Sequence, residues 1–136
     1  MDVQPGRGQL LLTAPIAQLP YTGTYHADEG YLYFRNLGNQ LLLGGGRNAY
    51  RQEEATWSTD CSTNIQDYLE KYLHQVLLPG KKPKILNRWA GTMAFSYQGI
   101  KQPIFIKEAN LTIVARMSGM GLALSPELGK KAADLL

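Results

Sequence analysis

The chain has 136 residues, of which 44% are hydrophobic and 18% charged, and its formal net charge is +3. This composition is typical of one ordinary globular domain and does not by itself indicate nucleic-acid binding; the basic cluster Lys81, Lys82 and Lys84 lies in a Pro-flanked turn. The single cysteine, Cys61, excludes an internal disulfide, and neither a signal pattern nor an apolar stretch of roughly 20 residues occurs, so we expect a cytoplasmic protein that does not enter a membrane.

Strand patterns fill the first part of the chain. The segment GQLLLTAPI, residues 8–16, is apolar and bounded by Gly and Pro, which predicts a strand. GYLYFRNLGNQLLLGGG, residues 30–46, predicts a hairpin that turns within residues 36–39. In its first strand Tyr31, Tyr33 and Arg35 alternate with Leu32 and Phe34, so we expect one aromatic and polar face and one apolar face.

A helix is predicted from about Asn64 to Leu78, ending before Pro79-Gly80. Thr63 and Gln66 have the spacing of a capping box at its start. The helix should pack one face on a sheet, because its apolar residues recur every three or four positions: Ile65, Tyr68, Leu69, Tyr72, Leu73, Val76 and Leu77.

Three further strands are predicted in KILNRWAGTMAFS, QPIFIK and NLTIVARM, and a helix closes the chain. That helix begins either at Gly121 or at Ser125-Pro126, which suit an N-cap and a first helical position. The expected fold class is therefore α+β: a mainly antiparallel sheet with one packed helix, and a last strand and helix that belong to a second layer.

Two glycine motifs are candidate cofactor sites. Gly119 and Gly121 lie between the strand NLTIVA and the last helix, an arrangement that often seats an anionic or polar cofactor group, but Leu124 breaks the G-x-G-x-x-G/A fingerprint. GGGRNA, residues 44–49, has the formal spacing, but no helical pattern follows it and no acid ends a second strand about 20 residues later. We interpret GGGRNA as a glycine-rich strand end.

No catalytic side chain and no metal site are assigned. The spacing of His26, Asp28 and Glu29 matches no familiar ligand set, and His74 lies on the predicted helix as an ordinary flanking residue. No Ser-His-Asp set or carboxylate pair emerges, and nothing pairs with Cys61 as a thiol nucleophile would require.

Five segments, in order, resemble the C-terminal portion of FAD-dependent oxidoreductases of the D-amino-acid oxidase and glycine oxidase family: PGRGQLLLTAPI, GYLYFRNLGNQLLLGGGRN, RWAGTMAF, QPIFI and NLTIVARMSGMGLALSPELGKKAADLL. The resemblance implies that residues 1–109 form mainly a substrate-binding sheet domain. It implies that residues 110–136 form the last strand, glycine loop and helix of the FAD-binding domain. Ser118, Gly119, Met120 and Gly121 would then seat the pyrimidine edge of the flavin.

The same resemblance implies oxidation of a small-molecule amine or amino acid by hydride transfer to the flavin. Nothing in the sequence corresponds to the G-x-G-x-x-G loop and ribose-binding acid that hold the rest of FAD in family members. We therefore expect a C-terminal fragment that is inactive alone and needs its missing N-terminal FAD-binding half.

Candidate substrate-binding residues also follow from the resemblance. Met93 occupies the position where many members carry an arginine that grips the substrate carboxylate. Arg47 and Arg116 are the candidates to replace it, although each is also an ordinary strand-end arginine. Tyr33 and Trp89 are candidate cavity walls, although core aromatics are commoner.

The alternative function is a stand-alone, non-catalytic β-rich binding or interaction module, whose glycines serve only turns. The last helix is expected to be the least anchored element, and it would dock on another chain, as in a homo-oligomer. Its leucines would then lack cover within the chain: Leu122, Leu124, Leu128 and Leu135.

Overall fold

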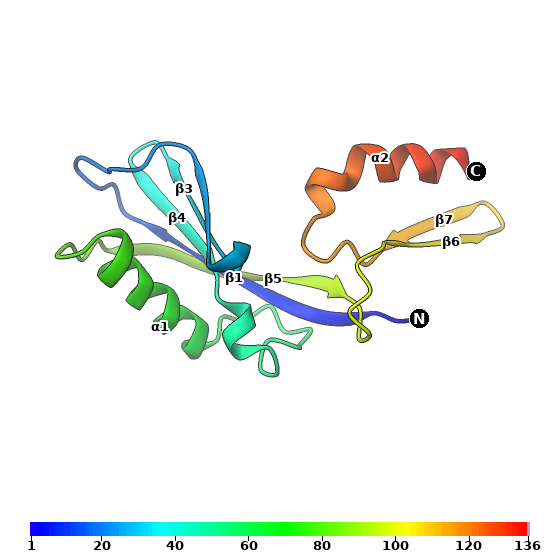
Figure 1. The fold of residues 1–136 in the computed structure, drawn as a ribbon, viewed down its shortest axis with the longest axis horizontal. Helices are drawn as coiled ribbons and strands as arrows, with labels where there is room; N and C mark the ends of the chain where they lie inside the picture. The colour runs from blue at the N-terminus through cyan, green and yellow to red at the C-terminus, as the bar shows by residue number, and fades with distance from the viewer. Residues whose placement is uncertain (136) are drawn as a thin grey trace. The chain divides into compact units, whose positions relative to one another are not determined.

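The structure, a computed structural model, describes residues 1–135 and divides the chain into two compact units. One unit is residues 7–92, here called the sheet unit; the other joins residues 1–6 to the chain from Met93 onward and is called the hairpin–helix unit. Two long strands, β1 (Gln4–Thr13) and β5 (Ile85–Phe95), run from one unit into the other (Figure 1).

The main sheet has five strands in the order β2-β3-β4-β1-β5, with β2 at Thr24–Ala27, β3 at Leu32–Leu37 and β4 at Gln40–Gly45. The predicted hairpin is β3–β4, an antiparallel pair whose register runs from Leu32↔Gly45 to Leu37↔Gln40. Gly38 turns the chain in the left-handed conformation at φ 58°. Strand β1 pairs antiparallel with β4, in agreement with the predicted antiparallel sheet.

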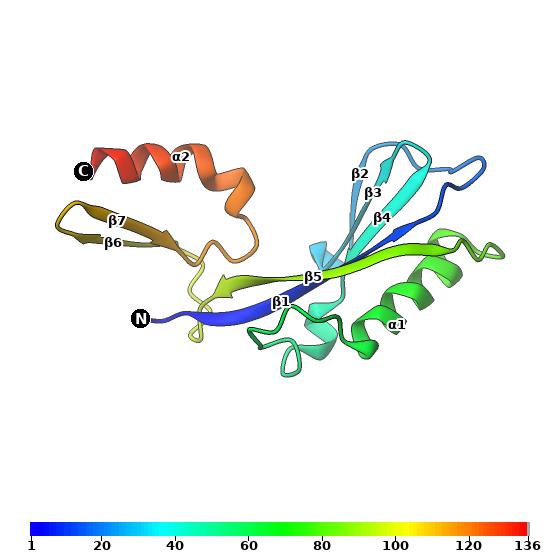
Figure 2. The ribbon, with the colours of Figure 1, turned by 180° about the vertical axis from the view of Figure 1, so that it is seen from behind.

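The hydrophobic core lies between this sheet and helix α1 (Thr63–Tyr72), which a π-helical turn extends over Leu73–Leu77. Figures 1 and 2 show α1 running along one face of the sheet. The strands and α1 each contribute one apolar side, as their spacing predicted. The buried core residues are Leu11, Ile16, Leu32, Phe34, Leu41, Leu43, Ile65, Leu69, Leu73, Leu77 and Leu78.

The predicted capping box at the start of α1 is wrong. Ser62, not Thr63, is the N-cap residue, and no side chain caps the helix. The Gln66 side chain is buried and its amide donates to Gln9 Oε1 at 3.2 Å instead of reaching back to the helix start. The Gln66 amide is therefore bonded to Gln9 in β1, far away in the sequence, and does not form the local capping box.

In the hairpin–helix unit, β6 (Ile104–Glu108) and β7 (Leu111–Ala115) form a two-stranded antiparallel sheet of their own, followed by α2 (Gly121–Asp134). Their register runs from Ile104↔Ala115 to Glu108↔Leu111. The expected domain boundary between residues 109 and 110 falls in the turn of this hairpin. The assignment of either side to a substrate or flavin domain stays a prediction, and Leu136 lies outside the described residues.

Helix α2 begins at Gly121, the earlier of the two predicted starts, so Pro126 lies inside it. Proline has no N–H to donate to the carbonyl of Leu122, and the Ser125 hydroxyl donates to that carbonyl instead, at 2.9 Å. The expectation that Leu128 lacks cover is wrong, because this residue is only 8% exposed, whereas Leu122 is 93% exposed.

The fold class is α+β, as predicted: mostly antiparallel sheet with two helices. None of the helices within residues 1–135 has the length and apolarity that crossing a bilayer requires.

Candidate functional site

The segment between β7 and α2 has an unusual backbone. Arg116, Ser118 and Gly119 all adopt left-handed conformations, with φ of 64°, 51° and 85°. Such conformations cost energy for residues with a Cβ and are concentrated at functional sites. The loop is held on one side by β5, because the Ser118 N–H donates to the carbonyl of Ala94 at 3.1 Å.

This loop leads into α2, and no negative charge offsets the positive end of the helix dipole there. No side chain caps the helix, and its first turn contains no acidic residue. The first N–H groups of a helix have no carbonyl partner within the helix and carry its positive dipole end. The atoms nearest to a Cβ placed on Gly121 belong to the Met117 side chain, at 3.6 to 3.9 Å. Of the four predicted cofactor-binding residues, Ser118 and Met120 donate their N–H groups to the carbonyls of Ala94 and Met117, at 3.1 and 2.9 Å. Gly119 and Gly121 therefore present the backbone donors of this segment at the positive end of the helix dipole, and the role of the four residues toward a cofactor stays a prediction.

Met93 lies against the same loop. A Cβ placed on Gly119 would lie 3.4 Å from the Met93 sulfur, and both residues belong to the hairpin–helix unit. Of the predicted substrate-binding residues, Met93 and Arg116 are the two that share a unit with the predicted flavin loop.

Arg116 is buried, 7% exposed, and its guanidinium is committed to protein partners. Nη1 donates to Asp2 Oδ2 at 2.8 Å, while Nε and Nη2 donate to the carbonyl of Gln102 at 3.1 and 2.8 Å. The Ser96 hydroxyl, the Tyr97 N–H and Arg116 together lower the pKa of the Asp2 carboxyl. This pairing gives Arg116 a part in holding the loop, and its role toward substrate stays a prediction.

Tyr33 and Trp89 lie on the sheet face that α1 does not cover. Tyr33 alternates with the core residues Leu32 and Phe34, and its ring packs over Gly44, where a Cβ would come within 2.7 Å. Burial raises the pKa of Tyr33. The neighbour of Trp89, Arg88, instead bonds to Gln66 on the α1 side at 2.6 Å. Tyr33 lies on β3 and Trp89 on β5, which β4 and β1 separate in the sheet, and their role as cavity walls stays a prediction.

Arg47 follows the glycine-rich end of β4. Gly45 and Gly46 are left-handed, with φ of 116° and 77°, and Cβ atoms there would collide with Tyr31 and Tyr68. GGGRNA is thus a strand end in tight contact with its surroundings, as interpreted from the sequence, and not a nucleotide loop. Burial, and then Arg51, lower the pKa of Arg47.

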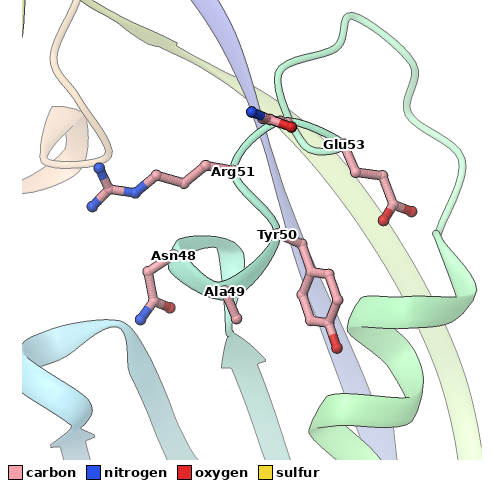
Figure 3. A pocket seen from close by; sticks show the side chains of 6 residues that line it. Asn48, Ala49, Tyr50, Arg51 and Glu53 are labelled. Carbon is pink, nitrogen blue, oxygen red and sulfur yellow. The ribbon is translucent and has the colours of Figure 1, made fainter.

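A surface hollow of about 440 Å³ follows directly on Arg47. Figure 3 shows Arg51 and Glu53 extending in opposite directions from the segment that follows the short helical turn Arg47–Tyr50. The lining is one consecutive run, residues 48–53, and includes none of the predicted substrate-binding residues. In the part of the chain that the structure describes, no group of three or more His, Cys, Asp or Glu side chains gathers as a metal site.

Sequence reasoning missed a buried charge network in the sheet unit. Glu54 is 0% exposed and receives two hydrogen bonds from Arg7, at 2.8 and 2.7 Å, one from Gln9 at 2.8 Å and one from Ser62 at 2.8 Å. Burial opposes the charged carboxylate, but these donors outweigh it and lower the pKa of Glu54. The available signal was Gln9, a polar residue in alternation with core Leu11, which implies a buried polar partner.

One comparison with known proteins identifies a family. The model of the family DAO, FAD dependent oxidoreductase, matches residues 1–135. Among curated proteins, none matches the chain significantly.

Three solved structures show the same fold. Glycine oxidase from Geobacillus kaustophilus superposes with a TM-score of 0.73 at 22% identity, over 99% of this chain and 35% of its own. L-proline dehydrogenase from P. horikoshii gives 0.72 at 20%, over 98% and 35%. Glycine oxidase from Bacillus cereus ATCC 14579 gives 0.73 at 16%, over 98% and 36%. The chain thus spans about a third of the length of each.

Proposed function

Because the chain belongs to the family of FAD-dependent oxidoreductases, we propose that it forms the substrate-side sheet and the flavin-edge loop of an enzyme that oxidises a small amine or amino acid. The observation that carries this proposal is the uncapped N-terminus of α2, which follows the left-handed backbone of Ser118 and Gly119 and where Gly119 and Gly121 keep their N–H groups available. Backbone donors at a helix N-terminus favour negative charge and admit close approach.

Bound FAD would supply the chemistry, by accepting a hydride from the substrate carbon. The contribution of this chain is electrostatic and positional. The N–H groups at the start of α2 stabilise negative charge at the pyrimidine edge, as preorganised donors do where charge develops in a reaction. Gly119 leaves the approach open because it has no Cβ, and Met93 closes one side of the loop.

The remainder of the FAD, its adenine dinucleotide, is held elsewhere in this proposal. The strand pairs β1–β4, β2–β3, β3–β4 and β6–β7 are antiparallel, so none of them belongs to a parallel βαβ unit of the kind that binds a dinucleotide. The chain also covers 35% of a related glycine oxidase chain. We propose that the dinucleotide-binding half is supplied by further polypeptide and that residues 1–136 alone are inactive.

The test places one negative charge at the start of α2. Gly121→Glu puts a carboxylate at the first helical position, whereas Gly129→Glu makes the same substitution later in the helix, where a Cβ would meet nothing within 4 Å. Both changes replace glycine by a better helix former, so helix propensity changes in the same direction in each. They differ in whether the carboxylate lies at the proposed flavin edge.

We expect Gly121→Glu to weaken FAD binding and lower the flavin reduction potential in the FAD-loaded protein, and Gly129→Glu to leave both unchanged. The measurements are the FAD dissociation constant and a spectroelectrochemical titration. Equal effects of the two variants would contradict the flavin-edge assignment. Absence of FAD binding by the complete protein would favour the alternative, a non-catalytic β-rich interaction module.

A further inference from the structure

Three of the four methionines of the chain gather at the proposed flavin-edge loop. The Met93 sulfur lies 3.4 Å from a Cβ placed on Gly119, and Met117 lies 3.6 Å from a Cβ placed on Gly121. Met120 is part of the loop and 57% exposed. We call Met93, Met117 and Met120 the methionine cluster. It is apolar, polarisable and conformationally adaptable, as thioether side chains are.

The hairpin–helix unit has four lysines, and all four are exposed: Lys101, Lys107, Lys130 and Lys131. Arg116 is its one arginine, and that guanidinium is buried against Asp2 and Gln102. Lys107 lies toward the turn of the β6–β7 hairpin, at the opposite end of β7 from the loop. Lys131 pairs with Glu127 at 3.4 Å in the later turns of α2. A carboxylate arriving beside Met93 would therefore meet thioethers in place of a guanidinium fork.

Building on the proposed function, we infer that Met93 is a specificity-determining residue: the enzyme takes amines that present a neutral, apolar group to the methionine cluster and discriminates against α-amino acids that would bring a carboxylate there. An ion moved from water to an apolar site without a charged or hydrogen-bonded partner is strongly disfavoured. A neutral group loses little hydration and gains dispersion contacts with the sulfur.

The experiment uses the FAD-loaded enzyme and two matched pairs of ligands. Glycine and glycinamide are the substrate pair, which differ in carboxylate against neutral amide. Isobutyrate and isobutyramide are the binding pair, read from the perturbation of the flavin absorbance spectrum without turnover. Intrinsic reactivity differences within the substrate pair cancel when the ratio of kcat/KM is compared between variants.

Three variants separate the effect of Met93 from a general effect of charge. Met93→Arg introduces the guanidinium fork, and Met93→Leu keeps an apolar side chain of similar size. Leu111→Arg adds the same charge at an exposed position beside the hairpin turn, where the native side chain is 52% exposed. In Met93→Arg we expect the ratio of glycinamide to glycine in kcat/KM to fall by at least about tenfold, because a hydrogen-bonded charge pair replaces an unpaired anion. Met93→Leu and Leu111→Arg should keep the wild-type ratio.

The binding pair keeps the inference testable if Met93→Arg fails to hold FAD. The wild type and Met93→Leu should bind isobutyramide at least about tenfold more tightly than isobutyrate. Equal or tighter binding of isobutyrate by the wild type would overturn the inference, as would an unchanged substrate ratio in a flavin-loaded Met93→Arg enzyme. In either case retained flavin would leave the proposed function standing, whereas an enzyme without flavin would defeat both.

Discussion

At the scale of single residues, Glu54 is the side chain that we expect to contribute most to the stability of the fold. It is a buried carboxylate that joins β1, through Arg7 and Gln9, to Ser62 at the start of α1. A buried ion pair adds little compared with apolar packing, but removal of one partner leaves the other charge buried and unpaired. Arg7, itself 7% exposed, would be that charge.

We predict that Glu54→Gln lowers the free energy of unfolding by about 3 kcal/mol or more. The control is Glu53→Gln, the neighbouring exposed carboxylate, which accepts a single hydrogen bond from Asn64 at 2.8 Å and should change stability by less than about 1 kcal/mol. Urea unfolding followed by circular dichroism measures both. Equal destabilisation by the two variants would refute the role given to the network.

The lowered pKa of Glu54 also predicts a pH dependence. Because the folded-state pKa lies below the ordinary value of 4.5, the stabilising contribution is fully present above that value and is lost as pH falls through the folded-state pKa. The wild type should lose stability on acidification below about pH 4.5, and Glu54→Gln should lose less over the same range. Unfolding curves at stepwise lower pH test this; parallel pH profiles of the two proteins would contradict it.

At the scale of elements, periodicity predicted what depends on local pattern. The β3–β4 hairpin and α1 follow from alternation and from the three- or four-residue spacing of apolar side chains. The failures involve partners distant in sequence. The Gln66 side chain donates to Gln9 instead of forming the predicted capping box. Leu128 is buried in the folded chain, which the pattern of its helix alone could not show. Glu54 was missed for the same reason, since Arg7 is its partner across 47 residues.

The end of β4 gives a prediction at this scale. Gly45 has φ 116°, and a Cβ there would lie 2.0 Å from the Tyr31 carbonyl oxygen, so Gly45→Ala must displace β3 from β4. We expect a loss of roughly 3 kcal/mol or more in the free energy of unfolding. Gly38→Ala, in the hairpin turn at φ 58° with nothing within 4 Å, should cost only about 1 kcal/mol. Thermal and urea unfolding compare them, and a loss in Gly45→Ala no greater than in Gly38→Ala would contradict the close contact.

For the whole molecule, the family was predicted from five ordered segments, and the match to the family model over residues 1–135 confirms it. The sequence could not place the candidate substrate residues, because Tyr33, Arg47 and Trp89 belong to the sheet unit, whereas Met93 and Arg116 belong to the hairpin–helix unit. Their roles depend on the part of the enzyme that would hold the dinucleotide. The methionine cluster likewise became visible only when three separate methionines were placed beside one loop.

We propose that this chain supplies the flavin edge and substrate side of an FAD enzyme but not the dinucleotide site. The most direct measurement is the FAD stoichiometry of the purified chain after incubation with FAD and gel filtration, read from the flavin absorbance. We predict no stoichiometric flavin on the chain alone, because one polar loop cannot offset the cost of ordering a dinucleotide, and one FAD per chain when the dinucleotide-binding half is present. Tight binding of one FAD by the chain alone would contradict the account.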